Sequence, residues 1–167
     1  MSDRILPVLL LAALFAGAMA LMYLGWRSRG RSQADVPAPP PDAPLEQLGE
    51  TLAEGPFEAV YVSTVRAGDP LDRIVAHGLG SRSRARISVG SAGTWRIDRE
   101  GARSFTLPAD TVTGLFTTPG IAGKAVGGDG LLLIRWQLSE NAPALDTGLR
   151  MDRRADHDLL LTRKELA

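Results

Sequence analysis

The stretch Arg84–Leu107, RARISVGSAGTWRIDREGARSFTL, sets the architecture of the chain. It contains three short runs that alternate apolar and polar residues or are rich in β-branched and aromatic ones: Arg84–Val89, Thr94–Asp98 and Ser104–Leu107. Half-buried strands show this pattern. The glycine-bearing connections between the runs have the length of hairpin loops. Neighbouring strands are therefore predicted to be antiparallel.

Four further runs of the same kind lie outside this stretch: Phe57–Thr64, Val112–Thr117, Leu131–Leu138 and Leu145–Arg150. The tail Asp152–Leu166 places leucines among charges without a helix breaker, which predicts one C-terminal helix. Strands first and a helix last predict a mainly β (α+β) domain over residues 57–167. We expect an antiparallel barrel or curled sheet capped by that helix.

An uncharged apolar run, Ile5–Trp26, lies near the N-terminus. As a helix, about 22 residues at roughly 1.5 Å per residue reach about 33 Å, enough for roughly 30 Å of hydrocarbon. A secretory signal peptide is the alternative, but its apolar region is only about 7 to 15 residues long and follows a positive segment. Residues 1–27 are therefore predicted to be an uncleaved transmembrane helix with a short N-terminus.

Basic residues flank this run mainly on its C-terminal side, at Arg27, Arg29 and Arg31, against Arg4 alone before it. Basic flanks mark the cytoplasmic side of a span. The N-terminus is therefore predicted to lie outside and the remainder of the chain in the cytoplasm. This makes the chain a single-pass protein of the inner (plasma) membrane, with the lipid bilayer as its first partner.

Residues 28–56 are predicted to connect the span to the domain. Ser32–Pro44 holds five prolines and almost no apolar content, so we expect a semi-rigid spacer that lifts the domain off the membrane. Leucines then recur at helical spacing before Gly55 and Pro56, at Leu45, Leu48 and Leu52. This spacing predicts a short amphipathic helix that packs on the domain.

The composition argues against several functions. The 19 basic and 19 acidic side chains balance, whereas a general nucleic-acid binder shows a basic excess, so no nucleic-acid partner is expected. The chain has no cysteine, which excludes disulfides, cysteine-ligated zinc and thiol catalysis. Any electrostatic function must therefore rest on local patches of charge.

Gly120–Lys124 resembles a phosphate-binding loop only in part. Such a loop requires G-x-x-x-x-G-K-[ST] and a helix directly after it. Thr118 holds the place of the first glycine and Ala125 that of the hydroxyl, and an apolar β run follows. We therefore expect a glycine-rich strand connection here and no cofactor.

Arg82, Arg84 and Arg86 stand at alternate positions entering the second strand, which puts them on one face while apolar residues take the other. Arg73 precedes them, and Lys124 joins them if its loop folds to the same rim. Together these residues form a candidate binding site for an anionic ligand. The other interpretation is a solvated strand face whose arginines pair with scattered acids.

His77 has Asp69, Asp72 and Ser81 nearby in sequence, so a catalytic triad or a carboxylate–histidine site can be drawn. The simpler interpretation is a loop histidine with aspartates that cap a turn at Asp69 and Pro70. His157, between two aspartates in the last helix, is expected to face water. No catalytic residue and no metal site is predicted.

Four segments of the chain resemble a known family by their order and spacing: Gly68–Gly80, Gly120–Lys124, Gly130–Trp136 and Leu145–Arg150. As a set they resemble small actinobacterial single-span membrane proteins with a bacterial pleckstrin-homology-like (PH-like) domain, which are often encoded near pyrimidine and carbamoyl-phosphate genes. The resemblance implies a seven-stranded, strongly bent barrel capped by a helix, and it brings no known activity. Some members are labelled transporters, but an ionisable residue that would mark a solute pathway is missing from this span.

We therefore predict a membrane-anchored, non-catalytic PH-like module for binding or scaffolding, with an unidentified protein partner held at a groove or open strand edge. One alternative is a sensor of anionic lipid or phosphate ligands that uses the arginine row near the anionic leaflet. A second alternative is a regulatory subunit tied to nucleotide metabolism, which rests only on the gene neighbourhood that the resemblance implies.

Overall fold

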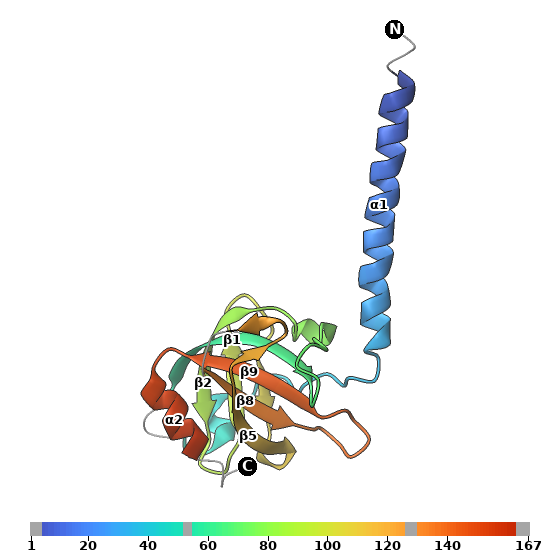
Figure 1. The fold of residues 1–167 in the computed structure, drawn as a ribbon. Helices are drawn as coiled ribbons and strands as arrows, with labels where there is room; N and C mark the ends of the chain where they lie inside the picture. Colours follow the sequence, from blue (N-terminus) through green and yellow to red (C-terminus); the bar gives the residue numbers. More distant parts are fainter. Residues whose placement is uncertain (1–4, 52–54, 126–129, 163–167) are drawn as a thin grey trace. The chain divides into compact units, whose positions relative to one another are not determined.

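A computed structural model of the chain describes residues 5–51, 55–125 and 130–162, and it divides into two compact units, residues 1–34 and 35–167. The first unit is a single helix, α1 (Ile5–Ser32), shown in blue in Figure 1. Its segment Pro7–Gly25 is long and apolar enough to cross a membrane, a property that membrane anchors and signal sequences share. The helix continues through the basic flank because no proline interrupts it before Pro37.

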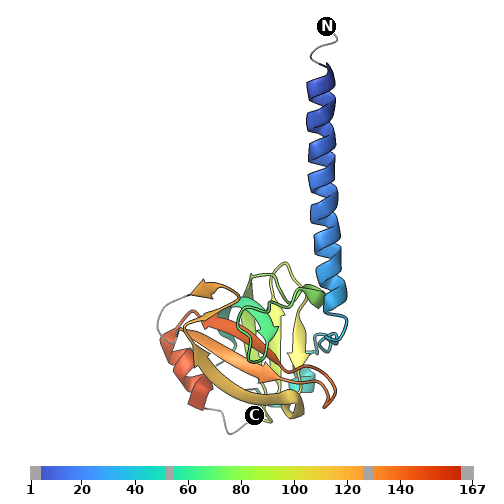
Figure 2. The same ribbon diagram turned by 45° about the vertical axis from the view of Figure 1, so that its right-hand side comes forward.

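The second unit is built on one seven-stranded antiparallel sheet. Its strands are β1 (Phe57–Arg66), β2 (Ser83–Val89), β3 (Trp95–Arg99), β4 (Phe105–Leu107), β5 (Val112–Thr118), β8 (Leu131–Trp136) and β9 (Leu145–Met151). They run in the order β4-β3-β2-β1-β9-β8-β5, and the sheet curls into a half-barrel (Figures 1 and 2). The helix α2 (Arg154–Thr162) packs against β8 and β9.

Several short elements complete the unit. A small hairpin joins β6 (Gly120–Ile121) to β7 (Lys124–Ala125), and its two central residues, Ala122 and Gly123, have φ of 52° and 73°. Positive φ at both central positions is typical of a tight type I′ hairpin turn. The remaining elements are 3₁₀ turns: η2 (Leu45–Leu48), η3 (Ala76–Gly78) and η4 (Ala109–Thr111).

The core lies on the concave side of the curled sheet. Alternate residues of β2 and β3 are buried there, and aromatic rings from several strands fill the centre, with Phe105 6.3 Å from Tyr61 and 6.4 Å from Trp136 between ring centroids. Leu160 of α2 is fully buried in the same cluster. The alternation seen in the sequence therefore does direct one face of each strand into the core.

The predicted strands and C-terminal helix are confirmed. All seven strands form where the alternation placed them, with ends that differ by one or two residues. The last helix forms over Arg154–Thr162, and the remainder of its predicted range lies outside the described residues.

The connecting segment differs from the prediction of a semi-rigid spacer followed by a short amphipathic helix. Residues 35–44 belong to the second compact unit, where Val36 is buried at 2% exposure. The helix is reduced to the single turn η2, because Gly49 follows it with φ of 70° and ends it. Leu48 is buried but Leu45 is 49% exposed, and Leu52 lies outside the described residues.

Candidate functional site

The segment before the sheet, residues 35–43, lies along β4 and is called the strap below. Pro41 of the strap forms a β-bridge with Phe105, and the Thr106 N–H donates a hydrogen bond of 3.4 Å to the Pro40 carbonyl oxygen. The strap therefore occupies the β4 edge of the sheet as an extended peptide supplied by the same chain.

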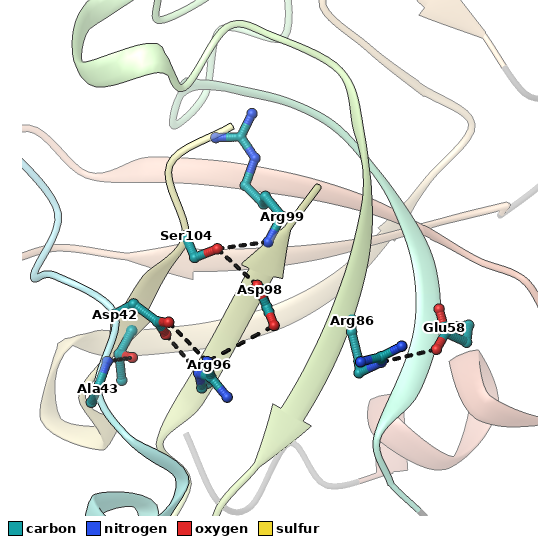
Figure 3. Close-up of polar contacts among 9 residues, drawn as sticks. Asp42, Ala43, Glu58, Arg86, Arg96, Asp98, Arg99 and Ser104 are labelled. Atoms are coloured by element: carbon teal, nitrogen blue, oxygen red, sulfur yellow. Dashed lines mark hydrogen bonds and ion pairs between the residues drawn. The ribbon is translucent and has the colours of Figure 1, made fainter. Parts of the chain in front are cut away.

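Two arginines hold the strap by its acidic residues. Arg96 of β3 donates to both carboxylate oxygens of Asp42, at 2.6 and 2.8 Å, and lies 3.8 Å from Asp98 (Figure 3). The bond to Asp42 raises the pKa of the Arg96 guanidinium above its ordinary value. Arg66, at the end of β1, donates to Asp35 at 3.0 Å. Bidentate arginine–carboxylate pairs are among the stronger polar contacts in proteins, so the strap is pinned at both ends.

The other edge of the sheet is β5, which pairs with β8 along its inner side. In the ranges 5–51, 55–125 and 130–162, no strand and no isolated bridge pairs with the outer side of β5. An uncovered edge presents backbone N–H and C=O groups with which another extended chain can pair. The two edges therefore differ: the strap pairs with one, and no described strand or bridge pairs with the other.

A pair of side chains, Phe116 and Arg135, lies beside the β5 edge and is called the edge platform below. Phe116 is 36% exposed, and the Arg135 guanidinium lies 4.8 Å from the centroid of its ring. Arg135 donates to both oxygens of the buried Asp146 carboxylate, at 2.7 and 2.8 Å, and this bond raises the pKa of Arg135. A Cβ at Gly114 would lie 2.9 Å from the Phe116 ring, so the glycine leaves room for that ring.

The structure separates the arginines of the predicted anion site. Arg84 donates to both oxygens of Asp152, at 3.1 and 2.9 Å. Arg86 donates to Glu58 at 3.1 Å (Figure 3). Both side chains are exposed and lie on the predicted outer face of β2. Arg86 also lines a recess of about 210 Å³, together with Arg96 and Asp98. Each of these two arginines therefore already has an acidic partner.

The remaining three predicted residues form a separate cationic cluster of Arg73, Arg82 and Lys124. Burial lowers the pKa of the Lys124 amine, and repulsion by Arg73 and Arg82 lowers it further. Arg73 donates a hydrogen bond to the Gly80 carbonyl oxygen. The structure thus groups Lys124 with Arg73 and Arg82, while Arg84 and Arg86 are engaged by other residues.

The histidine site drawn from sequence is not assembled around His77. Its Nε2 lies 2.9 Å from the Val36 carbonyl oxygen of the strap. Asp69 accepts hydrogen bonds from the Leu71 and Asp72 N–H groups, at 3.0 and 3.2 Å, and therefore caps a turn. Over the part of the chain that the structure describes, no group of three metal-ligating side chains is present.

The prediction that His157 faces water is wrong. Its side chain is buried at 3% exposure, and its Nδ1 lies 3.0 Å from an Asp158 carboxylate oxygen. In α2, position 157 lies one turn before Leu160, which is fully buried, so both side chains share the face that packs on the sheet. The flanking aspartates suggested a solvated position, whereas the helical period decides the face.

Comparison with known proteins identifies the family of this fold. Residues 33–165 match the family described as "Bacterial PH domain-like". The chain belongs to this family. The match begins inside the connecting segment, so the strap is part of the PH-like domain as the family defines it. No curated protein and no solved structure matches the chain at a significant level.

Sequence reasoning missed the edge platform of the PH-like domain. Arg135 and Asp146 are directly opposed in the β8–β9 register. The available signal was a single charge inside the apolar run Leu131–Trp136, followed by an acid just after the next turn. A charge in such a run requires a partner on the neighbouring strand.

Proposed function

We propose that the chain is a membrane-anchored, non-catalytic binding module whose PH-like domain faces the cytoplasm and takes an extended protein segment along the outer edge of β5. One observation carries this proposal: the β4 edge is occupied by the strap, while no described strand or isolated bridge pairs with the outer side of β5. Strand addition at an open edge is a common mode of peptide recognition.

The strap supplies an example of this mode within the chain. Pro40 and Pro41 approach β4 in an extended conformation, and an arginine of the neighbouring strand, Arg96, binds the acid that follows. The β5 edge offers a corresponding arrangement, because Arg135 on the neighbouring strand lies over Phe116. A segment that adds to β5 would pair with its backbone, while the edge platform selects an apolar or acidic side chain.

The anchor and the orientation are supported by the span and its flanks. Pro7–Gly25 is long and apolar enough to cross a membrane, and arginines follow it at Arg27, Arg29 and Arg31. A cytoplasm-active reporter fused after Ala167 is expected to be active, and a reporter that works only outside is expected to be silent. The reverse result, or a mature chain that has lost its first residues, would contradict the anchor.

Site-specific photo-crosslinking in cells tests the binding edge. A photoreactive amino acid at Thr113 or Thr117 of β5 is expected to crosslink one partner segment, at sites a few residues apart, because an added strand runs alongside β5 residue by residue. The matched control is Arg150, an exposed position on β9, which is paired on both sides by β1 and β8. Equal capture at Arg150, or crosslinks scattered over unrelated segments, would rule out strand addition at β5.

A further inference from the structure

We infer that the β1–β2 loop and the β6–β7 hairpin form a surface that docks on an anionic bilayer, the same bilayer that α1 crosses. The inference rests on the membrane anchor of the proposed function, but it uses residues other than the β5 crosslinking positions Thr113 and Thr117. The surface is called the docking rim below. It comprises Leu71 and the cations Arg73, Arg82 and Lys124.

Leu71 is the apolar contact of the docking rim. It is 74% exposed, more than any other large apolar side chain described in residues 35–162. The turn that carries it is fixed, because the Asp69 carboxylate accepts the N–H groups of Leu71 and Asp72. A fixed turn that presents a leucine to solvent is suited to insertion at a lipid interface, where a buried side chain gains the hydrophobic free energy.

The loop and the hairpin are joined into one surface. The Ala122 N–H donates a hydrogen bond of 2.7 Å to the Pro70 carbonyl oxygen. Leu71 and Lys124 line the same open groove, of about 380 Å³, whose other walls include Pro70 and Ile121. An apolar side chain and a cation are therefore held side by side by two different elements.

The charges of the docking rim favour an anionic surface. Arg73 donates to the Gly80 carbonyl oxygen, two residues before Arg82, and the bond from Ala122 to Pro70 joins the hairpin of Lys124 to the same loop. The three cations therefore lie on adjoining segments, and repulsion by Arg73 and Arg82 lowers the pKa of Lys124. Among the described residues, neither Arg82 nor Lys124 has a carboxylate within ion-pair distance. The nearby Asp72 is bound by Arg66 at 3.0 Å. Anions brought next to this cluster would relieve its repulsion.

The docking rim lies where the chain enters the domain. Arg66 donates to both Asp35 and Asp72, at 3.0 Å each, and so joins the first residue of the compact unit to the loop that carries Leu71. Nine residues, 26–34, separate Asp35 from the end of the apolar segment at Gly25. A tether of this length keeps the local concentration of lipid high, which makes weak contacts sufficient for docking.

A bilayer fits these observations better than a soluble phosphate or a peptide. A soluble anion would gain nothing from an exposed leucine at the margin of the cations. A bilayer contacts apolar and basic side chains at once, and each basic residue near an anionic surface contributes roughly 1 kcal/mol. The arginines with acidic partners, Arg84 and Arg86, are not part of the docking rim.

Fluorescence in nanodiscs tests the inference on the full chain. Because the chain has no cysteine, Ala125→Cys gives a single labelling site on β7 at the groove, and Ser91→Cys gives a control at the other end of the sheet. An environment-sensitive dye at Ala125 is expected to shift to the blue in nanodiscs with anionic lipid and to stay water-like in zwitterionic ones. The dye at Ser91 is expected to stay water-like in both.

Substitutions identify the groups responsible. Arg82→Gln and Lys124→Gln are each expected to lower the ratio of docked to undocked domain about fivefold, as roughly 1 kcal/mol per charge requires. Leu71→Ser is expected to lower it by at least as much, and Arg150→Gln, an exposed arginine on β9, to leave it unchanged. The tryptophan fluorescence of the domain reports that each variant is folded.

The outcomes are distinguishable. An equal shift in zwitterionic nanodiscs, no shift in either lipid, or a shift caused by inorganic phosphate in zwitterionic nanodiscs would each overturn the inference. Failure here leaves the β5 crosslinks of the proposed function intact, since the variants do not change the crosslinking positions Thr113 and Thr117. Loss of the β5 crosslinks with docking preserved would instead overturn the proposed function alone.

Discussion

The guanidinium of Arg99 lies over the ring of Tyr61, 3.9 Å from its centroid, inside the core of the PH-like domain. Both side chains are buried, at 4% and 0% exposure. Arg99 donates to the Ser81 carbonyl oxygen at 2.6 Å, and Tyr61 donates to that of Leu79 at 2.7 Å. The pair therefore ties β3 and β1 to the loop between β1 and β2, which carries the docking rim.

Stability at high pH is expected to depend on Tyr61. Burial raises the pKa of its phenol to about 12. The folded state therefore keeps the phenol proton above pH 10.0, the ordinary pKa of tyrosine, where the unfolded state has lost it. The contribution of the protonated phenol to the free energy of unfolding is fully present below pH 10. It is lost as the pH rises towards 12, and the free energy of unfolding falls by about 1.4 kcal/mol per pH unit. Urea unfolding between pH 9 and 11, followed by tryptophan fluorescence, measures it.

Tyr61→Phe is the control for this pH dependence, because it removes the titrating group and keeps the ring. The variant is expected to be less stable at neutral pH by about 1 kcal/mol, since the Leu79 carbonyl loses one of its two donors and the buried Thr64 hydroxyl loses a partner. Between pH 10 and 11 its stability should fall less steeply than that of the parent chain. Parallel slopes for the two chains would show that other groups cause the alkaline loss.

Asp42→Asn is expected to loosen the strap. The bond between Arg96 and Asp42 is bidentate and partly buried, and its loss should cost about 1 kcal/mol. Amide exchange should report this locally, because the Ala43 N–H is bonded to the Thr106 hydroxyl and the Thr106 N–H to a strap carbonyl. Protection of both amides should fall about fivefold.

The control is Asp110→Asn, at an exposed position on η4, which is expected to leave the protection of both amides unchanged. Unchanged protection in Asp42→Asn would contradict the proposal that the Arg96–Asp42 pair holds the strap.

The strap and the arginine pairs also show where sequence reasoning stopped. The strands were predictable because side-chain alternation is a local property that the sheet preserves. The pairs Arg84–Asp152 and Arg96–Asp42 join residues 68 and 54 positions apart, and no local pattern predicts such partners. The sequence therefore predicts a single anion site. In the fold, Arg84 and Arg86 pair with acids, and the other three cations belong to the docking rim. The contact between His77 and the Val36 carbonyl oxygen of the strap likewise joins residues that are distant in sequence.

Gly114→Val is expected to disrupt the edge platform. Added carbon atoms at this position would meet the Phe116 ring, which lies only 2.9 Å from an ideal Cβ, and would push it from beneath Arg135. Overpacking of this kind costs about 1 to 3 kcal/mol. The Arg135 side-chain protons should lose their ring-current shift, and crosslinking from Thr113 should decrease. Thr113→Val, at the adjacent exposed position, is expected to retain the ring-current shift; its loss there as well would mean that the Gly114 effect is not specific.

The β6–β7 hairpin gives two glycine-related substitutions with opposite expected signs. A Cβ at Gly120 would lie 2.8 Å from the Lys124 carbonyl oxygen, so Gly120→Ala must force the two strands of the hairpin apart. Ala122 has φ of 52°, a conformation that disfavours a side chain by about 1 kcal/mol, so Ala122→Gly relieves strain there. Part of that gain is offset by the greater freedom of glycine in the unfolded chain, which leaves a net gain of about 0 to 1 kcal/mol. Urea unfolding should therefore rank the stability of Ala122→Gly at or above that of the parent chain and the stability of Gly120→Ala below it.

In anionic nanodiscs Gly120→Ala should also weaken docking, because the hairpin holds Lys124 beside Leu71. Full docking in a chain whose hairpin is displaced would mean that Lys124 contributes no contact to the lipid surface.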